Sequence, residues 1–372
     1  MSISTIRFNK QDRPGFYKEL RKKVNAYFKE NGKAKTANTR MKVKTAFMLL
    51  LYTLPLVLLL SGVIGSLLIM FLMWGLMGLG MVGIGTSIMH DANHGSYSKK
   101  QGVNKTLGYL VNLVGGYHVN WKIQHNVLHH TFTNVEGFDE DIENAMFRFS
   151  PNADRKRIYR FQAFYAPILY GIMTLYWLLG KDPIQLKGYA DRDLLKTQGR
   201  NLWTALTEMS LNKVAYLGLT LLLPMLLLPF PWWQTLLGFL SMHFIAGLFL
   251  SLIFQPAHVI TDVDFYVPDS KGGIENDWAV HQFKTTANFA RGSKAFSWFI
   301  GGLDQQVEHH LFPNICHVHY RKIAPIVKEI AKNYEVPYYE HKTFFGAIGG
   351  HFRMLHSLGK GSFTYDLKLD TS

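Results

Sequence analysis

Histidines gathered in short clusters are the residues of this sequence most suited to chemistry. The central cluster is His-Asn-Val-Leu-His-His, and its histidines are His125, His129 and His130. On an α-helix, His125 and His129 lie one turn apart on one face, and His130 points about 100° away from His129. Each neutral imidazole offers one lone pair to a metal such as iron or zinc. The spacing therefore predicts that this cluster can serve two metal ions.

Two further clusters show the same close spacing, and one more histidine ends an apolar run. A histidine in that last position is costly unless it is partnered, which makes His258 a candidate additional ligand. One metal ion takes about four to six ligands, so a larger set indicates two ions with open positions. The candidate ligands are His90, His94, His125, His129, His130, His258, His309 and His310, with the side-chain oxygen of Gln306 as an addition.

Carboxylates and one amide lie beside these histidines in the sequence. Such groups can hold ligand imidazoles through the second ring nitrogen. The candidates for this role are Asp91, Asn93, Asp139, Asp141 and Glu308. For the acidic run that contains Asp139 and Asp141, a solvated loop is the alternative. For His243, we favour a hydrogen bond between helices, with a role near the substrate as the alternative. For His281, we favour a structural role.

Long uncharged blocks must position these clusters. Residues 45–90 and 214–261 contain no Asp, Glu, Lys or Arg. A membrane-spanning helix needs about 20 apolar residues, so each block predicts two spans joined by a tight turn. The fold class is an all-α membrane protein with four transmembrane helices in two hairpins and a cytosolic helical cap that holds the metal site. With four spans, the segments that carry all three clusters emerge on the same side of the membrane.

This pattern predicts five consecutive regions. They are a basic amphipathic segment (1–44), a first hairpin (45–89), a cytosolic region with two clusters and an interfacial helix (90–213), a second hairpin (214–257) and a cytosolic region with the third cluster (258–372). Residues 161–180 would be long enough for a fifth span. We expect an interfacial or re-entrant helix there, because a fifth span would separate His309 from His125.

Charge and cysteine content restrict the compartment. The formal net charge is +14, and the basic residues flank the apolar blocks, where anionic lipid attracts each by about 1 kcal/mol. This arrangement favours a membrane partner over nucleic acid. The turns within the hairpins carry no charge while residues 1–44 are basic, so the clusters are expected to face the cytosol. Cys316 is the single cysteine, which excludes an internal disulfide and suits a reducing compartment.

Two local patterns allow more than one interpretation. Residues 16–28 carry apolar side chains at helical spacing among many basic ones, which predicts an amphipathic helix that lies on the membrane or packs on the protein's own cap. Residues 78–83 read Gly-Leu-Gly-Met-Val-Gly, which matches a dinucleotide-binding pattern. No strand precedes this stretch, so we expect close helix packing in the membrane instead.

Taken together, the three clusters resemble the three histidine boxes of membrane fatty acid desaturases. The matching stretches are His90-Asp91-Ala92-Asn93-His94-Gly95, His125-Asn126-Val127-Leu128-His129-His130 and Gln306-Val307-Glu308-His309-His310-Leu311-Phe312-Pro313. The glutamine that opens the third box resembles the front-end subgroup, which includes the Δ6 or linoleoyl-type enzymes. The resemblance covers nearly the whole chain from about Thr45 onward.

The resemblance implies an oxygen-dependent acyl desaturase with a non-haem centre of two iron ions. The box residues His90, His94, His125, His129, His130, Gln306, His309 and His310 would be ligands, and His258 resembles the extra histidine after the last span of related enzymes. The substrate would be an acyl-CoA or a membrane acyl-lipid, and O2 and two electrons would be consumed to form a cis double bond.

The resemblance also concerns the electron donor. Many front-end enzymes carry a fused cytochrome b5 domain with a His-Pro-Gly-Gly motif, which this sequence lacks. We therefore expect a separate donor, ferredoxin or cytochrome b5, and a multi-pass protein of a bacterial cell membrane. Sphingolipid desaturation and lipid hydroxylation on the same scaffold are alternatives. A histidine-lined metal transporter is the alternative from another class.

Overall fold

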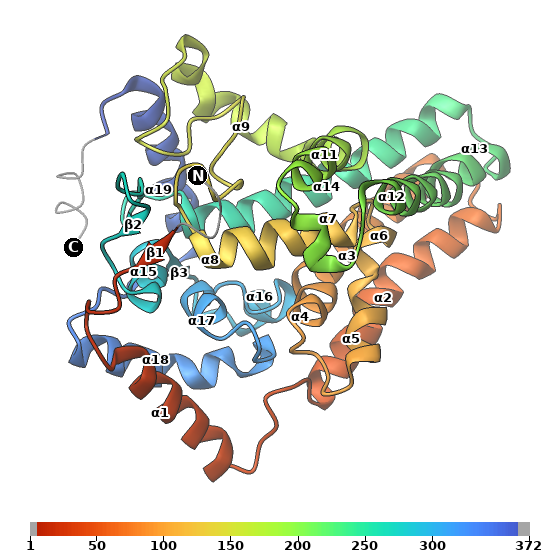
Figure 1. Cartoon of the computed structure of the whole chain (residues 1–372). Coiled ribbons are helices and arrows are strands. Elements are labelled where there is room, and N and C mark those ends of the chain that lie inside the picture. The colour runs from red at the N-terminus through yellow and green to blue at the C-terminus, as the bar shows by residue number, and fades with distance from the viewer. Residues whose placement is uncertain (1–5, 364–372) are drawn as a thin grey trace. The chain divides into compact units, whose positions relative to one another are not determined.

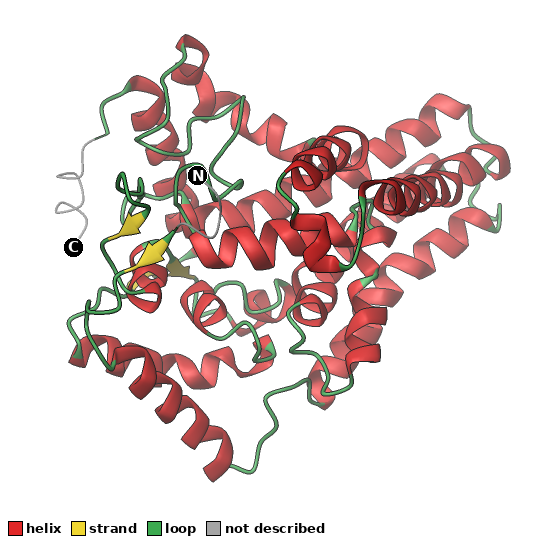
Figure 2. Cartoon of the chain, in the orientation of Figure 1, coloured by secondary structure: helices red, strands yellow, loops and turns green. Residues whose placement is uncertain are grey.

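The computed structural model describes residues 6–363, and the chain forms two compact units. Unit 1 comprises residues 6–36, 124–166 and 252–363, and unit 2 comprises residues 37–123 and 167–251. Helices make up nearly all the regular structure of both units (Figures 1 and 2). The all-helical fold class predicted from the sequence is confirmed.

Unit 2 contains the long apolar helices and the first histidine box. Its elements are α2 (Thr39–Leu60), α3 (Leu67–Gly83), the π-helix η2 (Ile84–Ile88), α4 (Met89–Asn93), α5 (Gln101–Gly108), α6 (Leu110–Leu113), α7 (His118–Trp121), α10 (Met173–Tyr176), η5 (Trp177–Lys181), α11 (Asp182–Asp191), η6 (Leu194–Gln198), α12 (Leu202–Leu217), η7 (Gly218–Leu222) and α13 (Leu223–Leu227). Three elements pass from one unit to the other: η3 (Lys122–His129), α9 (Gln162–Gly171) and α14 (Trp232–His258).

Four helices in the described part of the chain are long and apolar enough to cross a membrane. They are Thr39–Leu60, Leu67–Asn93, Leu202–Leu227 and Trp232–His258. Two of these helices begin before the uncharged block in which they continue, because an asparagine side chain caps the amino-terminal end of each. Asn38 accepts a hydrogen bond from the Met41 N–H at 3.1 Å, and Asn201 accepts one from the Thr204 N–H at 2.9 Å. The segments Arg157–Gly171 and Met173–Asp191 meet at 63° and would make a fifth crossing only if they form one broken span.

The glycines of residues 78–83 permit close helix packing. A Cβ atom on Gly80 would lie 2.8 Å from the backbone nitrogen of Tyr52 on α2. One on Gly78 would lie 2.7 Å from the carbonyl oxygen of Met242 on α14. These distances are too short for any side chain, so the small residues let α3 approach both neighbours. The packing interpretation of this motif is confirmed.

Unit 1 contains the other two histidine boxes among shorter helices and four short strands. Its remaining elements are β1 (Arg7–Phe8), α1 (Phe16–Glu30), α8 (His130–Phe132), η4 (Arg157–Phe161), β2 (Gly273–Ile274), α15 (Trp278–Lys284), β3 (Ala287–Phe289), α16 (Lys294–Phe299), α17 (Gln306–Leu311), η8 (His317–His319), α18 (Tyr320–Asn333), β4 (Tyr339–His341) and α19 (Phe344–Lys360). The strands pair in parallel as β1 with β2 and β3 with β4, which the sequence did not predict.

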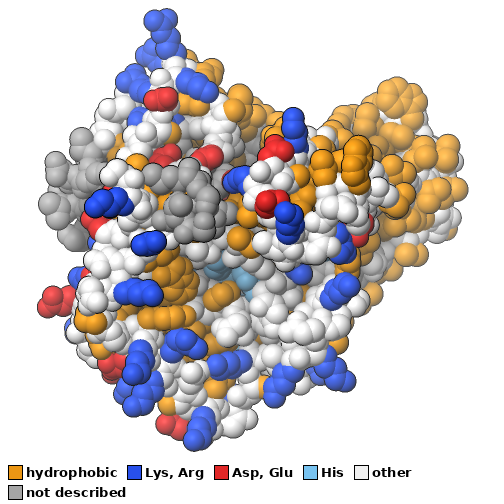
Figure 3. Space-filling view, in the orientation of Figure 1, with side chains coloured by type: hydrophobic (Ala, Val, Ile, Leu, Met, Phe, Trp, Pro, Cys, Tyr) orange, Lys and Arg blue, Asp and Glu red, His pale blue; other side chains and the backbone are white. Residues whose placement is uncertain are grey.

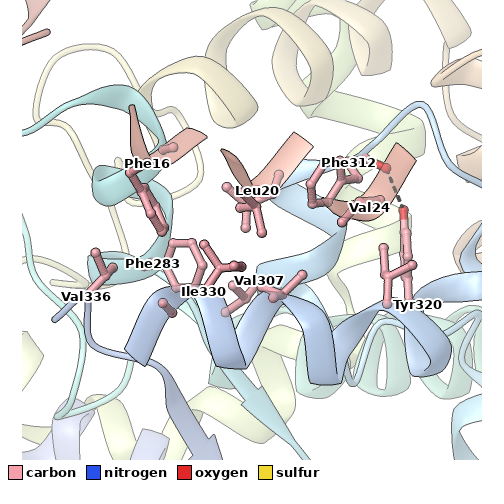
Figure 4. Close-up of a cluster of buried hydrophobic side chains, with 14 of the residues drawn as sticks. Phe16, Leu20, Val24, Phe283, Val307, Phe312, Tyr320, Ile330 and Val336 are labelled. Atoms are coloured by element: carbon pink, nitrogen blue, oxygen red, sulfur yellow. Dashed lines mark hydrogen bonds between the residues drawn. The ribbon is translucent and has the colours of Figure 1, made fainter. Parts of the chain in front are cut away.

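The apolar face of α1 packs into the core of unit 1. Phe16, Leu20, Val24 and Phe28 are at most 4% exposed. They join apolar side chains of α15, α17 and α18 in one cluster (Figure 4). Of the two interpretations of this amphipathic helix, the structure supports packing on the protein's own cap. The buried face of α1 also supports α17, which carries the third histidine box.

Candidate metal centre

The second histidine box lies on a π-helix rather than an α-helix. Residues Lys122–His129 form η3, in which each backbone N–H bonds five residues back instead of four. This winding brings His125 and His130 to the same side, and their Nε2 atoms lie 3.2 Å apart. The predicted separation of His130 from His125 is therefore wrong, because it assumed α-helical periodicity. π-Helical turns are rare and occur most often at functional sites.

One group of imidazoles consists of His129, His258 and His310. One ring nitrogen of each lies within 4.8 Å of the others. All three rings are at most 1% exposed. Their Nε2 atoms have no hydrogen-bond partner within the described part of the chain. Three buried lone pairs that point into one space are costly unless a cation fills it, so these residues fit a metal ion.

The other ring nitrogen of each imidazole is held by an oxygen. The Nδ1–H of His129 donates to the carboxylate of Asp139 at 3.1 Å. His258 donates to the carbonyl oxygen of Thr285 at 3.2 Å, and His310 to Oε1 of Gln282 at 2.8 Å. These bonds fix the tautomer that leaves the Nε2 lone pair available, which is the usual arrangement behind a metal-ligating histidine.

A second group adjoins the first. The Nε2 atom of His130 lies 3.2 Å from that of His125 and 3.0 Å from that of His309. A single ring nitrogen can donate only one hydrogen bond, so three nitrogens this close need a shared cation to avoid repulsion between lone pairs. His310 lies beside both groups, because its ring stacks on that of His130 with centroids 4.4 Å apart.

The first histidine box forms a pair within unit 2. His90 lies on α4 and His94 directly follows it, with ring centroids 4.8 Å apart. Both rings also pack against Trp121, at 5.8 and 5.9 Å. The carbonyl oxygen of Asp91 accepts the Ser96 N–H at 2.9 Å, and the Asn93 amide donates to Gly108 at 3.3 Å. These two bonds shape the chain around the histidine pair.

The acidic run after the second box is an ordered part of the centre. Asp139 is fully buried, and its carboxylate also accepts the backbone N–H groups of Asn134 and Asp141. Burial raises the pKa of Asp139, but His129 and these N–H groups outweigh burial and hold that pKa below its usual value. Asp141 lies 3.5 Å from His129 and accepts a hydrogen bond from Gln124. The solvated-loop alternative therefore does not hold for Asp139.

Gln306 and Glu308 play different parts on α17. Gln306 is 1% exposed, and neither of its side-chain polar atoms has a hydrogen-bond partner in the described residues. It lies four residues before His310 and so on the same helix face. Glu308 points the other way and accepts from Tyr338 at 2.7 Å and Asn288 at 3.0 Å. Glu308 therefore holds α17 in place and does not orient a ligand imidazole.

Several contributing residues were not predicted from the sequence. Gln282 and Thr285 hold imidazoles, and they lie on or just after α15, which no box contains. Phe254 covers the group, with its ring 5.1 Å from those of both His129 and His258. A Gln-Thr pair and a phenylalanine are too common to signal such roles. The position of Phe254 four residues before His258 was the available clue.

The two histidines assigned structural roles have protein partners. In unit 2, His243 bonds the hydroxyl groups of Tyr216 and Thr174, each at 3.0 Å. This joins neighbouring apolar helices, as predicted. In unit 1, the Nε2–H of His281 donates to the carbonyl oxygen of Thr133 at 2.7 Å. That bond ties α15 to the segment that follows the second box.

Comparison with known proteins agrees with this geometry. A family model described as "Fatty acid desaturase" matches residues 65–342. The chain belongs to this family. The desaturase is 36% identical over 353 residues to "sn-1 linoleoyl-lipid 6-desaturase" of Synechocystis sp., covering 94% of this chain and 96% of that one.

Two further relatives also match most of this chain. The chain is 33% identical over 348 residues to "sn-1 linoleoyl-lipid 6-desaturase" of Arthrospira platensis, covering 92% of each chain. It is 32% identical to "Acyl-lipid (8-3)-desaturase" of Physcomitrium patens, covering 98% of this chain and 75% of that one. The protein is thus a multi-pass membrane enzyme, an oxygen-dependent oxidoreductase of fatty acyl chains. This excludes the transporter alternative.

Proposed function

We propose that this desaturase introduces a cis double bond at the Δ6 position of a linoleoyl chain esterified to a membrane lipid. The observation that carries the proposal is the convergence of His129, His258 and His310, each held from behind by an oxygen. The regiochemistry rests on two relatives named as linoleoyl-lipid 6-desaturases and on Gln306 in the third box. An acyl-CoA substrate is the alternative carrier.

The metal-binding residues follow from the two groups of imidazoles. We propose that two iron ions are bound by His129, His258 and His310 on one side and by His125, His130 and His309 on the other. Gln306 would add a weaker, neutral oxygen ligand. The assignment of His90 and His94 rests on the resemblance of their box and on their pairing within unit 2.

The chain's own residues prepare the site for this chemistry. When bound, the irons supply the redox chemistry in which O2, two electrons and two protons take two hydrogens from adjacent methylenes and yield two waters. Asp139, Gln282 and the Thr285 carbonyl orient the imidazoles. The ring of Phe254 shields His129 and His258 from water. The protein thus determines which methylene is presented, and the cofactor performs the oxidation.

A basic cleft in unit 2 supports a substrate with an anionic carrier. The cleft has a volume of about 390 Å³, and its lining includes Lys105, Lys122 and Arg200 beside His118 and Asn93. Burial and, after it, the neighbouring Lys122 lower the pKa of His118 to about 4, so this imidazole adds no positive charge to the cleft at neutral pH. A phosphate group, of a phospholipid or of CoA, suits this lining.

Product analysis in a host that takes up linoleate tests the proposal. We expect a new fatty acid with an added double bond between carbons 6 and 7, seen by mass spectrometry of position-marking derivatives. The His129→Ala variant should make none of it. A hydroxylated linoleate would support the lipid hydroxylase alternative, and an unsaturated sphingoid base the sphingolipid alternative. Labelled linoleoyl-phospholipid and linoleoyl-CoA, offered separately to the purified enzyme, distinguish the two carriers.

The cellular location is part of the same proposal. We infer that the site faces the cytosol of a bacterial cell, because the uncharged hairpin turns and the basic residues 6–44 favour that orientation. Cysteine-accessibility labelling in intact cells tests this orientation. A cysteine placed in the turn of residues 61–66 should react with a membrane-impermeant reagent, and one at exposed Lys23 should not.

A further inference from the structure

The exposed side of α1 is strongly basic. Five cationic side chains of this 15-residue helix are exposed, and we call them the basic face of α1: Lys18, Arg21, Lys22, Lys23 and Lys29. Blue side chains gather over this helix in Figure 3. Glu19, one of its two acidic residues, accepts a hydrogen bond from Tyr334 at 2.8 Å. The helix therefore presents a positive potential to whatever approaches it.

The buried side of α1 excludes one explanation for this charge. An amphipathic helix that binds a membrane inserts its apolar face among the lipid chains. The apolar face of α1 is instead committed to the core of unit 1, where Leu20 and Val24 are fully buried (Figure 4). The helix has no apolar side left to insert. Its basic face fits a partner that is recognised by charge alone.

An aromatic connection runs from α1 to the second histidine box. Tyr17 lies beside the basic face, and the guanidinium of Arg21 sits 5.6 Å from its ring centroid. The Tyr17 ring contacts that of Trp278 edge-on, with centroids 5.3 Å apart. The Trp278 indole N–H donates to the carbonyl oxygen of His130 at 3.3 Å. The Trp278 side chain thus connects the half-buried Tyr17 to the backbone of a candidate metal ligand.

A second connection reaches the third histidine box. The Tyr17 hydroxyl donates to the carbonyl oxygen of Leu311 at 3.2 Å, and Leu311 is the last residue of α17. Burial raises the pKa of Tyr17, so its phenol stays neutral and can keep this bond at physiological pH. Both boxes of unit 1 are therefore in contact with the same pair of aromatic residues.

We propose that the basic face of α1 docks an acidic one-electron carrier protein and that Tyr17 and Trp278 connect the docked carrier electronically to His130. The inference rests on the proposed function, because a desaturase consumes two electrons in each turnover. Two carriers in succession would each give up one electron, and the irons held by the imidazoles would accept both electrons. Tyr17 and Trp278 remain neutral and lose no proton, since they bridge the transfer without being oxidised.

Binding of a defined carrier tests the docking surface. The full-length enzyme in neutral detergent is titrated with a plant-type [2Fe–2S] ferredoxin at about 10 mM and about 150 mM salt. We expect Lys22→Glu/Lys23→Glu to raise the Kd about tenfold at low salt and to flatten the salt dependence. Lys342→Glu/Lys360→Glu is the matched control, since it reverses two exposed charges of unit 1 elsewhere and should leave the Kd unchanged. Equal Kd values for the two double variants would overturn the docking surface.

Electron entry is tested separately with Trp278→Phe, which keeps an aromatic ring and removes the bond to His130. Stopped-flow oxidation of reduced ferredoxin by the iron-loaded enzyme should slow while the ferredoxin Kd stays at the wild-type value. Wild-type oxidation rates in this variant would refute the aromatic connection. Reduction by dithionite should be unaffected, because a small reductant does not depend on a docked carrier or on the aromatic connection.

Anionic vesicles distinguish a lipid partner from a protein partner. If Lys22→Glu/Lys23→Glu loses binding to phosphatidylglycerol vesicles and keeps its ferredoxin Kd, the face binds membrane and the proposal falls. Failure of the proposed function has a different signature, because the wild-type protein would then yield no desaturated product. If the wild type desaturates its substrate, and Lys22→Glu/Lys23→Glu and Trp278→Phe match it in ferredoxin binding and ferredoxin oxidation, only this inference is refuted.

Discussion

Asp139→Asn is the most informative single change in the proposed metal centre. In the wild type, the carboxylate accepts the Nδ1–H of His129 at 3.1 Å with both groups fully buried. Removing the negative charge weakens that bond and lowers the basicity of the Nε2 atom. Loss of such a supporting carboxylate costs about 10- to 100-fold in metal affinity, which is about 1.4 to 2.7 kcal/mol.

Iron retention against a competing chelator is the appropriate assay. The purified variants are equilibrated with a graded series of chelator, and bound iron is counted by mass spectrometry. Glu308→Gln is the matched control, because Glu308 is equally buried but bonds Tyr338 and Asn288 instead of an imidazole. We expect Asp139→Asn to lose iron at lower chelator concentration, whereas Glu308→Gln loses thermal stability and keeps its iron affinity. Wild-type iron affinity in Asp139→Asn would refute the assignment of His129 as a ligand.

Three further predictions concern the third box, unit 2 and pH. Gln306→His should keep bound iron, because imidazole replaces a weaker oxygen ligand, and metal analysis that finds an iron-free protein would contradict this. Lys213→Met should cost about 3 to 5 kcal/mol of stability, because the fully buried Asp182 carboxylate, 2.8 Å from the Lys213 ammonium, loses its charge partner. Thermal unfolding in detergent should show that Lys213→Arg is far less destabilised. Burial raises the pKa of Asp262, but the hydrogen bond and charge of His341 outweigh it and hold that pKa below 3.8. The stability that comes from the lowered pKa of Asp262 is therefore present above pH about 3.8 and lost as pH falls through the folded-state pKa, so the difference in unfolding midpoint between wild type and Asp262→Asn should shrink below that pH.

Composition and spacing were enough to predict the large-scale organisation. Residues 45–90 and 214–261 lack charge, and each is longer than two membrane-spanning helices of about 20 residues, so four apolar helices followed directly. The histidine boxes were equally visible, because three clusters with the same close spacing together indicate metal binding, although no one of them does so alone. Asp139 was also expected as a group that could hold a ligand imidazole, but only the structure shows that this imidazole is His129.

The α-helical period gave the wrong grouping of histidines where the helix itself departs from the common form. A π-helical winding of residues 122–129 sets His125 with His130 and leaves His129 to His258 and His310. The sequence does not reveal this winding, because π-helices are rare and residue spacing alone predicts the common α-helix. The packing of α1 was likewise undetermined by the sequence, because a basic amphipathic helix can pack on a lipid surface or on a protein core.

The sequence by itself determined which side chains are candidates to bind metal and which segments are apolar enough to cross a membrane, because both depend on residue type and local spacing. Only the tertiary structure decided how the imidazoles divide between two groups and which oxygens hold them. His129 and Gln282 lie more than 150 residues apart, and both serve the same centre through contacts that no local pattern records. Convergence of distant side chains depends on packing of the whole chain, and packing is a property of all the residues together.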